Sequence, residues 1–259
     1  MPESCLEFDA EAEVGRVVSF VREAVGGARA RGAVLGLSGG IDSAVVGSLC
    51  VRALGKERVS VVLIPSGSTP KEDMEDAADL ARSWGVRATT ADISGLVESC
   101  SKAAGTKGSK LAKANLQARL RMVILYYHAN SRGYLVAGTG DKSEISLGFF
   151  TKWGDGGADF LPVAHLYKTQ VRTLGRALGV PGRIVAKPSS PALWPGHKAT
   201  DELPADYDKL DVFLHYAFDK GMGANQAARR AGVSKSVAER IVEMHLRTAH
   251  KRGLPLSLA

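Results

Sequence analysis

A glycine-rich stretch between an apolar run and the start of a helical pattern carries the residue types best suited to chemistry. Glycines at such a junction let the backbone approach an anion, while free N–H groups and the positive end of the helix dipole face that anion. The stretch predicts a phosphate-binding loop, although a plain glycine turn with Ser and Asp caps would also suit this position. Its residues are Gly36, Leu37, Ser38, Gly39, Gly40, Ile41, Asp42 and Ser43.

The side chains of this loop also predict a metal ion. The loop lacks the pattern GxxxxGK[ST], in which a lysine reaches the β- and γ-phosphates. Ser38 and Ser43 can instead donate hydrogen bonds to phosphate oxygens, whereas Asp42 would repel phosphate unless a divalent cation lay between them. We therefore expect Mg²⁺ as a cofactor.

Polar residues after a later apolar run point to the same place. Thr139 and Glu144 follow a short predicted strand. Because the carboxyl ends of parallel strands meet at one edge of a sheet, Glu144 can join Asp42 around one Mg²⁺, although a helix cap would also explain it. Lys168 lies near the predicted N-terminus of the next helix, where a bare surface cation would oppose the helix dipole. An anion beside Lys168 is therefore expected.

A long helical pattern at residues 111–130 offers a further polar face. Asn115 and Arg119 are four residues apart, so they share a face of this helix. Arginine there suits a phosphate or a carboxylate, although a solvated basic face is the simpler interpretation of Arg119 alone. The opposite face is predicted to be a buried stripe of Leu116, Leu120, Ile124 and Tyr127.

The stretch TKWGDGGADFLP is too rich in glycine and acidic residues to belong to a core. Lys152, Asp155 and Asp159 in this loop could bind a substrate that carries charges of both signs. A flexible surface turn is the alternative interpretation.

Alternating strand and helix patterns must position these residues. Strands are predicted at 33–38, 59–64, 86–93 and 134–137, and helices at 41–54, 71–84, 111–130 and 166–178. This alternation predicts an α/β fold, a doubly wound parallel sheet with helices on both faces. A Pro-rich loop at 187–196 precedes a helical C-terminal extension with helices at about 206–220, 224–231 and 234–250. We expect one domain over residues 1–259, with a nucleotide-binding core at about 33–190 and the extension at about 200–252.

Composition limits the protein class. The 259 residues are 45% hydrophobic and 24% charged, as in globular proteins, and the longest apolar runs are too short to span a bilayer. An acidic N-terminus without a secretory pattern and three cysteines without CxxC spacing predict a cytoplasmic protein with reduced thiols. The net charge of +7 suits a polyanionic partner, whether nucleotide, nucleic acid or phosphate-rich substrate.

The motif SGGIDS resembles the pyrophosphate loop of the N-type ATP pyrophosphatases, which cleave ATP between its α- and β-phosphates. Further motifs look like NAD synthetase in their order and spacing, and the similarity runs from about residue 36 to about residue 252. These motifs are NLQARLRM at 115–122, GTGDKSE at 138–144, FFTKWGDGGAD at 149–159 and PG at 195–196.

The resemblance implies a reaction and its participants. The reaction is the amidation of deamido-NAD by ammonia to NAD, dependent on ATP and Mg²⁺, through an acyl-adenylate and with release of AMP and pyrophosphate. The resemblance implies these small molecules as partners and assembly as a homodimer, with neither membrane nor nucleic acid. Free ammonia, or ammonia from a separate protein, must supply the nitrogen, because the 35 residues before Gly36 are too few for a glutamine-hydrolysing domain.

The resemblance also implies residue roles. Asp42 and Lys168 act in catalysis, and Asp42 and Glu144 bind Mg²⁺. ATP contacts the glycine-rich loop together with Thr139, Lys168 and Ser190. Deamido-NAD contacts Arg119, Lys152, Asp159, His250 and Lys251. One departure from the family is Asp141, at a position where many relatives have Asn or His.

Two other functions remain open from the residues alone. The basic charge would suit another ATP pyrophosphatase such as a tRNA-modifying ligase, which would need a large surface facing RNA. Residues 226–237 resemble a helix-turn-helix, with a turn at Gly232 and a cap at Ser234, and this would suit DNA binding. Helix–glycine–helix turns are, however, common packing devices.

Overall fold

The computed structural model describes residues 3–190, 194, 196, 199–255 and 257–258. Within them, four strands form one parallel sheet in the order β3-β2-β1-β4. This arrangement confirms the α/β fold. The strands are β1 (Gly32–Gly36), β2 (Val59–Leu63), β3 (Ala88–Thr90) and β4 (Tyr134–Val136).

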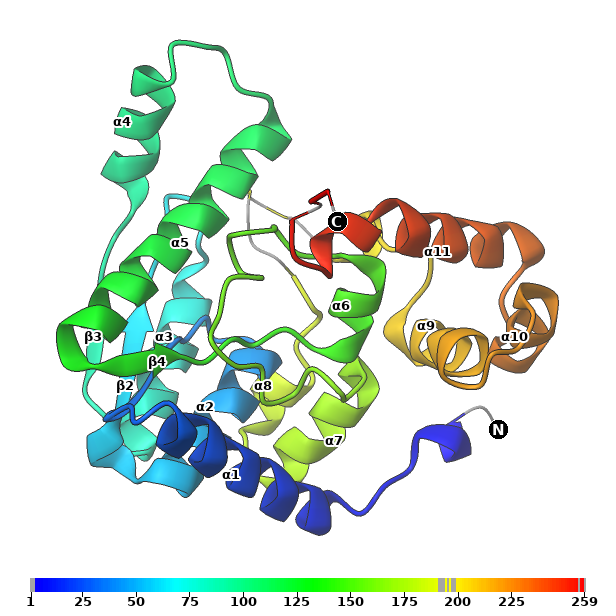
Figure 1. Cartoon of the computed structure of the whole chain (residues 1–259), viewed down its shortest axis with the longest axis horizontal. Coiled ribbons are helices and arrows are strands. Elements are labelled where there is room, and N and C mark those ends of the chain that lie inside the picture. Colours follow the sequence, from blue (N-terminus) through cyan, green and yellow to red (C-terminus); the bar gives the residue numbers. More distant parts are fainter. Residues whose placement is uncertain (1–2, 191–193, 195, 197–198, 256, 259) are drawn as a thin grey trace.

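Helices cover both faces of the sheet (Figure 1). Successive residues of β1 point to opposite faces: Leu35 joins the larger cluster with α1, α2 and α7, and Val34 joins the cluster beneath α5. The helices are α1 (Ala10–Gly27), α2 (Ile41–Leu54), α3 (Lys71–Ser83), α4 (Ser94–Ala103), α5 (Lys110–Arg132), α6 (Lys142–Leu147), α7 (Lys168–Ala177), α8 (Gly182–Val185), α9 (Tyr207–Leu214), α10 (Ala224–Ala231) and α11 (Lys235–Arg247). Short helical turns are η1 (Glu3–Leu6), η2 (Lys56–Arg58), η3 (Ala199–Asp201), η4 (His215–Asp219) and η5 (Ala249–Lys251).

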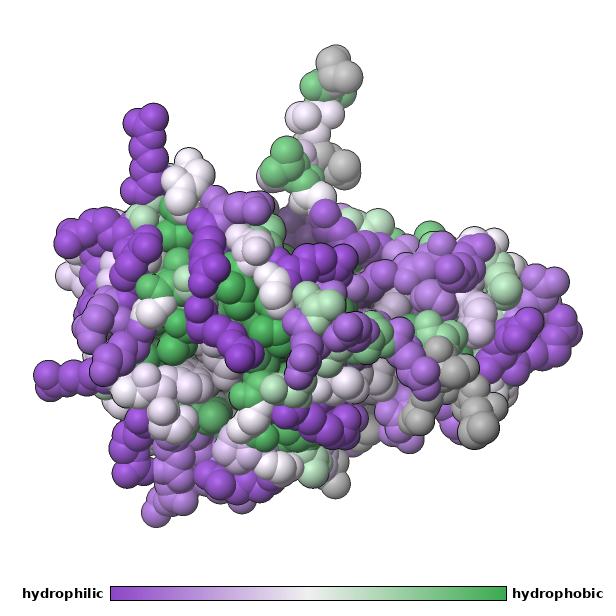
Figure 2. Space-filling model, turned by 90° about the horizontal axis from the view of Figure 1, so that it is seen from below, coloured by the Kyte–Doolittle hydropathy of each residue, from purple (hydrophilic) through white to green (hydrophobic). Residues whose placement is uncertain are grey.

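Helix α1 was not among the predicted elements. Asp9 caps it by accepting hydrogen bonds from the N–H groups of Glu11 and Ala12, and its buried residues recur at helical spacing. Figure 2 shows the molecule from below, the side on which α1 lies, with apolar surface surrounded by hydrophilic side chains. Phe20 of α1 is 42% exposed there and meets the ring of Phe160 edge-on.

Other boundaries differ from the sequence predictions. Strand β3 is shorter than residues 86–93, and helices α4 and α6 were not predicted. Tyr127 is 72% exposed, so the predicted buried stripe of α5 was wrong at this position. The side chains that α5 buries fully are small, Ala114, Ala118 and Ala129, which lets the helix lie close to the sheet and the loop after it.

The helices after residue 206 form a hydrophobic cluster of their own. Leu6, Leu147 and Tyr167 from the rest of the chain complete this cluster. Figure 1 shows α6 and α7 between the sheet and the α9–α11 group. The single-domain organisation stays a prediction. Among the described residues, no helix combines the length and the apolar character needed to cross a bilayer.

Candidate active site

The glycine-rich loop lies between β1 and α2, as the sequence predicts. Gly39 has a φ of 79°, and a Cβ there would collide with the backbone of Asp73, so only glycine fits. Ser43 Oγ accepts a hydrogen bond from Ser38 N at 3.2 Å and lies 3.1 Å from Ser38 Oγ. No side chain caps α2 at Gly40, so the N–H groups in the first turn of α2 are available to bind an anion.

Lys168 is the centre of a buried charge cluster. Its Nζ lies 2.7 Å from Asp42 Oδ2, 2.9 Å from Glu144 Oε1 and 2.9 Å from Asp141 Oδ2. Burial alone would lower the pKa of Lys168, but the three carboxylates outweigh burial and raise that pKa well above its usual range. Lys168 is therefore a fixed cation. The anions beside Lys168 in this structure are the carboxylates of Asp42, Asp141 and Glu144.

Helix α6 begins at this cluster through a capping box. Asp141 Oδ1 accepts from Glu144 N at 2.8 Å, and Glu144 Oε2 accepts from Asp141 N at 3.4 Å. Burial and the carboxylates of Asp141 and Asp42 raise the pKa of Glu144 well above its usual range, against the opposing effect of Lys168. From the sequence, Asp141 stood out only as a departure from the family, and its place in this cluster was not predicted.

The residues present fit a divalent cation. Three carboxylates surround one ammonium, and Asp42 Oδ1 is buried without a hydrogen-bond partner, while Asp141 Oδ2 is paired with Lys168 alone. In the described part of the chain, no three His, Cys, Asp or Glu side chains converge as a metal site by themselves. Mg²⁺ is commonly held by one or two carboxylates together with substrate phosphates, so a nucleotide would complete the ligand set here.

A second group of predicted residues gathers where α5 meets the loop after α6. Arg119 Nη2 donates to the carbonyl of Lys152 at 3.3 Å, and Lys152 Nζ donates to the carbonyl of His250 at 2.6 Å. Asn115 faces the same loop and accepts a hydrogen bond from Thr151 Oγ1 at 2.8 Å. The predicted face shared by Asn115 and Arg119 therefore meets this loop, and it brings Arg119, Lys152 and His250 together.

Two other predicted substrate residues support the backbone. Asp159 accepts hydrogen bonds from Val136 N at 2.7 Å and from Tyr126 Oη at 3.1 Å. Lys251 Nζ donates to the carbonyls of Gly148 and Phe150, both at 2.7 Å. Both side chains thus hold the loop that carries Lys152.

Thr139 lies two residues before Asp141 of the cluster, and Ser190 lies three residues after Lys187, which contacts Gly39. Thr139 is half-buried between β4 and α6, and Ser190 is exposed in the loop after α8. Pro195, which belongs to a predicted family motif, lies outside the described residues.

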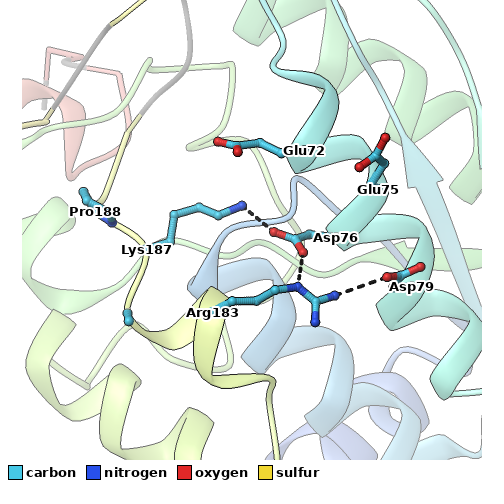
Figure 3. Close-up of a pocket in the computed structure, with 8 residues that line it drawn as sticks. Glu72, Glu75, Asp76, Asp79, Arg183, Lys187 and Pro188 are labelled. Atoms are coloured by element: carbon cyan, nitrogen blue, oxygen red, sulfur yellow. Dashed lines mark hydrogen bonds and ion pairs between the residues drawn. The ribbon is translucent and has the colours of Figure 1, made fainter.

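Charged residues of α3 and of the α8 region meet beside the glycine-rich loop, and Figure 3 shows Lys187 and Arg183 pointing toward Asp76. Lys187 Nζ lies 2.8 Å from Asp73 Oδ1, 2.6 Å from Asp76 Oδ2 and 3.4 Å from the Gly39 carbonyl oxygen. Arg183 also pairs with Asp76, at the edge of a cavity of about 680 Å³. Although burial opposes it, hydrogen bonds from Lys187 and Arg183 lower the pKa of Asp76. This bridge was not predicted from the sequence, although the i, i+3 spacing of Asp73 and Asp76 could have suggested it.

The predicted helix-turn-helix has the expected shape. Gly232 adopts a φ of 64° after α10, and Ser234 caps α11 by accepting from Val237 N. On the exposed side of α11, however, cations pair with acidic neighbours, as in Arg247 with Glu243 at 3.3 Å. Acidic side chains therefore offset part of the positive charge on this side of α11, and binding to a DNA backbone depends on such charge.

Known proteins resemble this chain over almost its whole length. A family model described as NAD synthase matches residues 13–255. A protein of Hyperthermus butylicus named NH(3)-dependent NAD(+) synthetase is 47% identical over 251 residues, which cover 96% of this chain and 91% of the relative.

Two solved structures show the same arrangement. An NMN synthetase from Francisella tularensis has a TM-score of 0.87 and 34% identity, covering 97% of this chain and 99% of its own. An NH3-dependent NAD synthetase from Campylobacter jejuni, in complex with the nitrate ion, has a TM-score of 0.83 and 28% identity, covering 98% and 100%.

Proposed function

The chain belongs to the NAD synthase family, and from this premise we propose that it catalyses the ATP-dependent amidation of deamido-NAD by ammonia. The products are NAD, AMP and pyrophosphate, and the enzyme is a ligase that forms a C–N bond. The observation that carries the proposal is the position of Lys168 and its carboxylates directly beside the glycine-rich loop at the start of α2.

The reaction has two steps. In the first, an oxygen of the nicotinate carboxylate attacks the α-phosphorus of ATP, the bond to the β-phosphate oxygen breaks, and pyrophosphate leaves. In the second, ammonia attacks the carbonyl carbon of the acyl-adenylate, AMP leaves, and a proton is lost to solvent. Positioning and neutralisation of charge contribute most to such phosphoryl chemistry.

The chain's own residues serve the first step. The N–H groups of the glycine-rich loop, the hydroxyls of Ser38 and Ser43, and Lys168 bind the pyrophosphate that leaves. Asp42 and Glu144 would hold Mg²⁺, which supplies positive charge to phosphate oxygens when it is bound. Thr139 and Ser190 are proposed to contact the nucleotide from the loops that carry them.

The second group of residues serves deamido-NAD. Arg119 and Lys152 present two cations to its phosphates and its carboxylate, beside His250. Asp159 and Lys251 are proposed to contact deamido-NAD as well, and their bonds to Val136 N and to the carbonyls of Gly148 and Phe150 hold the loop of Lys152 in place.

Assembly as a homodimer and a cytoplasmic location belong to the same proposal. Val123 and Tyr127 follow Arg119 at four-residue intervals on α5 and are 55% and 72% exposed, so apolar side chains face outward along this helix. A second copy that covers this face would lie beside Arg119. The free thiols of Cys5, Cys50 and Cys100 fit a reducing compartment.

The test is incubation of the purified chain with ATP, Mg²⁺, deamido-NAD and ammonium chloride while AMP and NAD are measured. We expect both products in equal amounts, and formation of both slowed on the order of 10²–10³-fold with Asp42→Asn at the same protein concentration. Release of AMP without NAD would place the chain with a different ATP pyrophosphatase. Glutamine in place of ammonium is expected to give no NAD.

The likeness to the NMN synthetase favours one second candidate, the mononucleotide acid deamido-NMN as substrate. Comparison of kcat/KM for deamido-NAD and deamido-NMN distinguishes the two. We expect deamido-NAD to be preferred, in line with the curated relatives.

A further inference from the structure

The first turn of α7 receives its hydrogen bonds from two other helices. Lys168 N donates to Ser143 Oγ of α6 at 2.9 Å, and Thr169 N donates to Asp211 Oδ2 of α9 at 2.9 Å. Within its own turn, the start of α7 has one further hydrogen bond, from Tyr167 N to Gln170 Oε1 at 3.0 Å, while the Tyr167 hydroxyl donates to Asp219 at 2.9 Å. The N–H groups of Lys168 and Thr169, in contrast, depend on tertiary contacts.

One carboxylate joins these contacts. Asp211 is fully buried, and its second oxygen, Oδ1, accepts a hydrogen bond from Ser143 Oγ at 2.6 Å. The two oxygens of Asp211 thus bind one donor on α6 and one on α7. A negative charge at the N-terminus of a helix is also favoured by the helix dipole.

The two helices held in this way carry the reacting cluster. Ser143 directly precedes Glu144, and Lys168 is the first residue of α7. Lys168 Nζ and Glu144 Oε1 are 2.9 Å apart. A shift of either helix start by a fraction of an ångström would change this distance. Displacements of about 1 Å at such positions can cost on the order of 10²-fold in rate.

We propose that Asp211 is a positioning residue for the adenylation step, because it holds the starts of α6 and α7 in the register that sets Lys168 against Glu144. This inference rests on the proposed function. It assigns to the helical extension a part in the chemistry of the first step, since Asp211 of α9 holds the two helix starts that carry the cluster. Helix α9 also places the ring centroid of Tyr207 5.3 Å from Lys168 Nζ. It leaves binding of deamido-NAD to the separate group around Arg119 and Lys152.

The experiment compares Asp211→Asn with Asp208→Asn, a matched change at an exposed position of the same helix. The measurement is the exchange of labelled pyrophosphate into ATP, which reports the adenylation step and depends on deamido-NAD. For Asp211→Asn we expect the exchange rate per folded molecule to fall about 10- to 100-fold, with KM for deamido-NAD within about twofold of the wild type. Asp208→Asn should behave as wild type.

Two results would overturn the proposal. One is an unchanged exchange rate in folded Asp211→Asn, and the other is a loss that disappears once rates are divided by the folded fraction from near-UV circular dichroism. If Asp211→Asn does not fold, Ser143→Ala decides, because it breaks the link from Asp211 through Ser143 Oγ to Lys168 N and leaves the bond from Thr169 N to Asp211 in place. Normal exchange in Ser143→Ala would then contradict the proposal, and a reduced rate with unchanged KM would support it.

Failure of the proposed function has a different signature. A wild-type chain that exchanges no pyrophosphate with deamido-NAD would refute the function itself. Exchange in the wild type together with normal exchange in Asp211→Asn would refute only the role of Asp211.

Discussion

At the scale of single residues, Lys168 combines complete burial with three anionic neighbours. Leaving a buried charge without a partner costs several kcal/mol, so the carboxylates stabilise the lysine before any phosphate is bound. When ATP is bound, its phosphate oxygens and a metal ion can share these partners. Lys168 can thus exchange its carboxylate partners for phosphate oxygens.

Asp42→Asn should reduce turnover far more than it weakens deamido-NAD binding. The carboxylate's proposed task is to hold the metal against the leaving pyrophosphate, and loss of one such interaction costs on the order of 10²–10³ in rate. Steady-state kinetics and direct titration of deamido-NAD measure the two effects. Glu144→Gln should be non-additive with Asp42→Asn, since both serve one ion. Near-normal turnover of Asp42→Asn would remove the assignment of Mg²⁺ to this site.

Arg119→Ala should weaken deamido-NAD and leave ATP nearly unchanged. Loss of a charge-assisted contact costs about 1.5–3 kcal/mol, or about one to two decades in affinity. Truncation of a solvated side chain should stay within about 0.5 kcal/mol. Arg132→Ala, at an exposed position near the end of the same helix, is the matched control. Isothermal titration calorimetry measures the affinities for deamido-NAD and ATP. An unchanged affinity for deamido-NAD would mean that Arg119 is a solvated side chain that does not bind this substrate.

Asp211 predicts a dependence of stability on pH. Burial raises the pKa of Asp211 from its ordinary value of 3.8 to about 7. Between pH 3.8 and about pH 7, the folded chain binds more protons at Asp211 than the unfolded chain does. The contribution of Asp211 to the free energy of unfolding is therefore greatest below pH 3.8, and it is lost as the pH rises through about 7.

Urea unfolding of the wild type and of Asp211→Asn at pH 5 and pH 8 measures this contribution. Other buried carboxylates titrate in both proteins, so only the difference between the two proteins reports Asp211. We expect a larger fall in stability from pH 5 to pH 8 in the wild type. An equal fall in both proteins would argue against the raised pKa.

At the scale of elements, the end of α11 acts as a cap for α6. Thr248 Oγ1 donates to the carbonyl of Leu147, and Arg252 Nη1 donates to that of Ser146 at 3.1 Å. Lys251 Nζ likewise donates hydrogen bonds to the carbonyls of Gly148 and Phe150. The C-terminal segment therefore satisfies carbonyls that the end of α6 and the following loop leave unpaired.

Lys251→Met should destabilise this junction. The variant keeps an apolar stem and loses two hydrogen bonds from a charged donor, so we expect a loss of roughly 1.5–3 kcal/mol in the free energy of unfolding. KM for deamido-NAD should rise as well, since the same loop carries Lys152. Chemical denaturation and steady-state kinetics measure both. Lys235→Met at the exposed start of α11 should change neither, and an equal effect of both variants would disprove the capping role.

How much could be predicted from the sequence differed between elements. The strands and helix α2 were predictable because continuous apolar runs and a glycine junction are local signals, and α2 begins and ends at the predicted residues. Helix α6 was missed because six residues are too few to show a helical period, and its cap is formed by Asp141. The partnership of Asp211 with Ser143 and Thr169 joins residues 68 and 42 positions apart, which no local pattern reveals.

At the scale of the whole molecule, the exposed face of α5 predicts a dimer. Tyr127→Asp should place a charge in the middle of an apolar contact and shift the protein towards monomer, with an unchanged fold because the side chain is already exposed. Sedimentation velocity over a range of concentrations measures the change. Glu98→Gln, at an exposed position of the neighbouring α4, is the control. A wild-type monomer at all concentrations would exclude the proposed homodimer.

The contact between Asp211 and the first turn of α7 also affects the order in which the protein folds. Glu144 and Lys168 leave the ribosome well before residue 211, so the register of α6 and α7 stays incomplete until α9 has been synthesised and has docked. Contacts of such sequence separation form late because a long loop must close first. On dilution from denaturant, the helical circular dichroism signal should therefore return before pyrophosphate exchange does. Catalytic competence would then be the last property that the folding chain acquires.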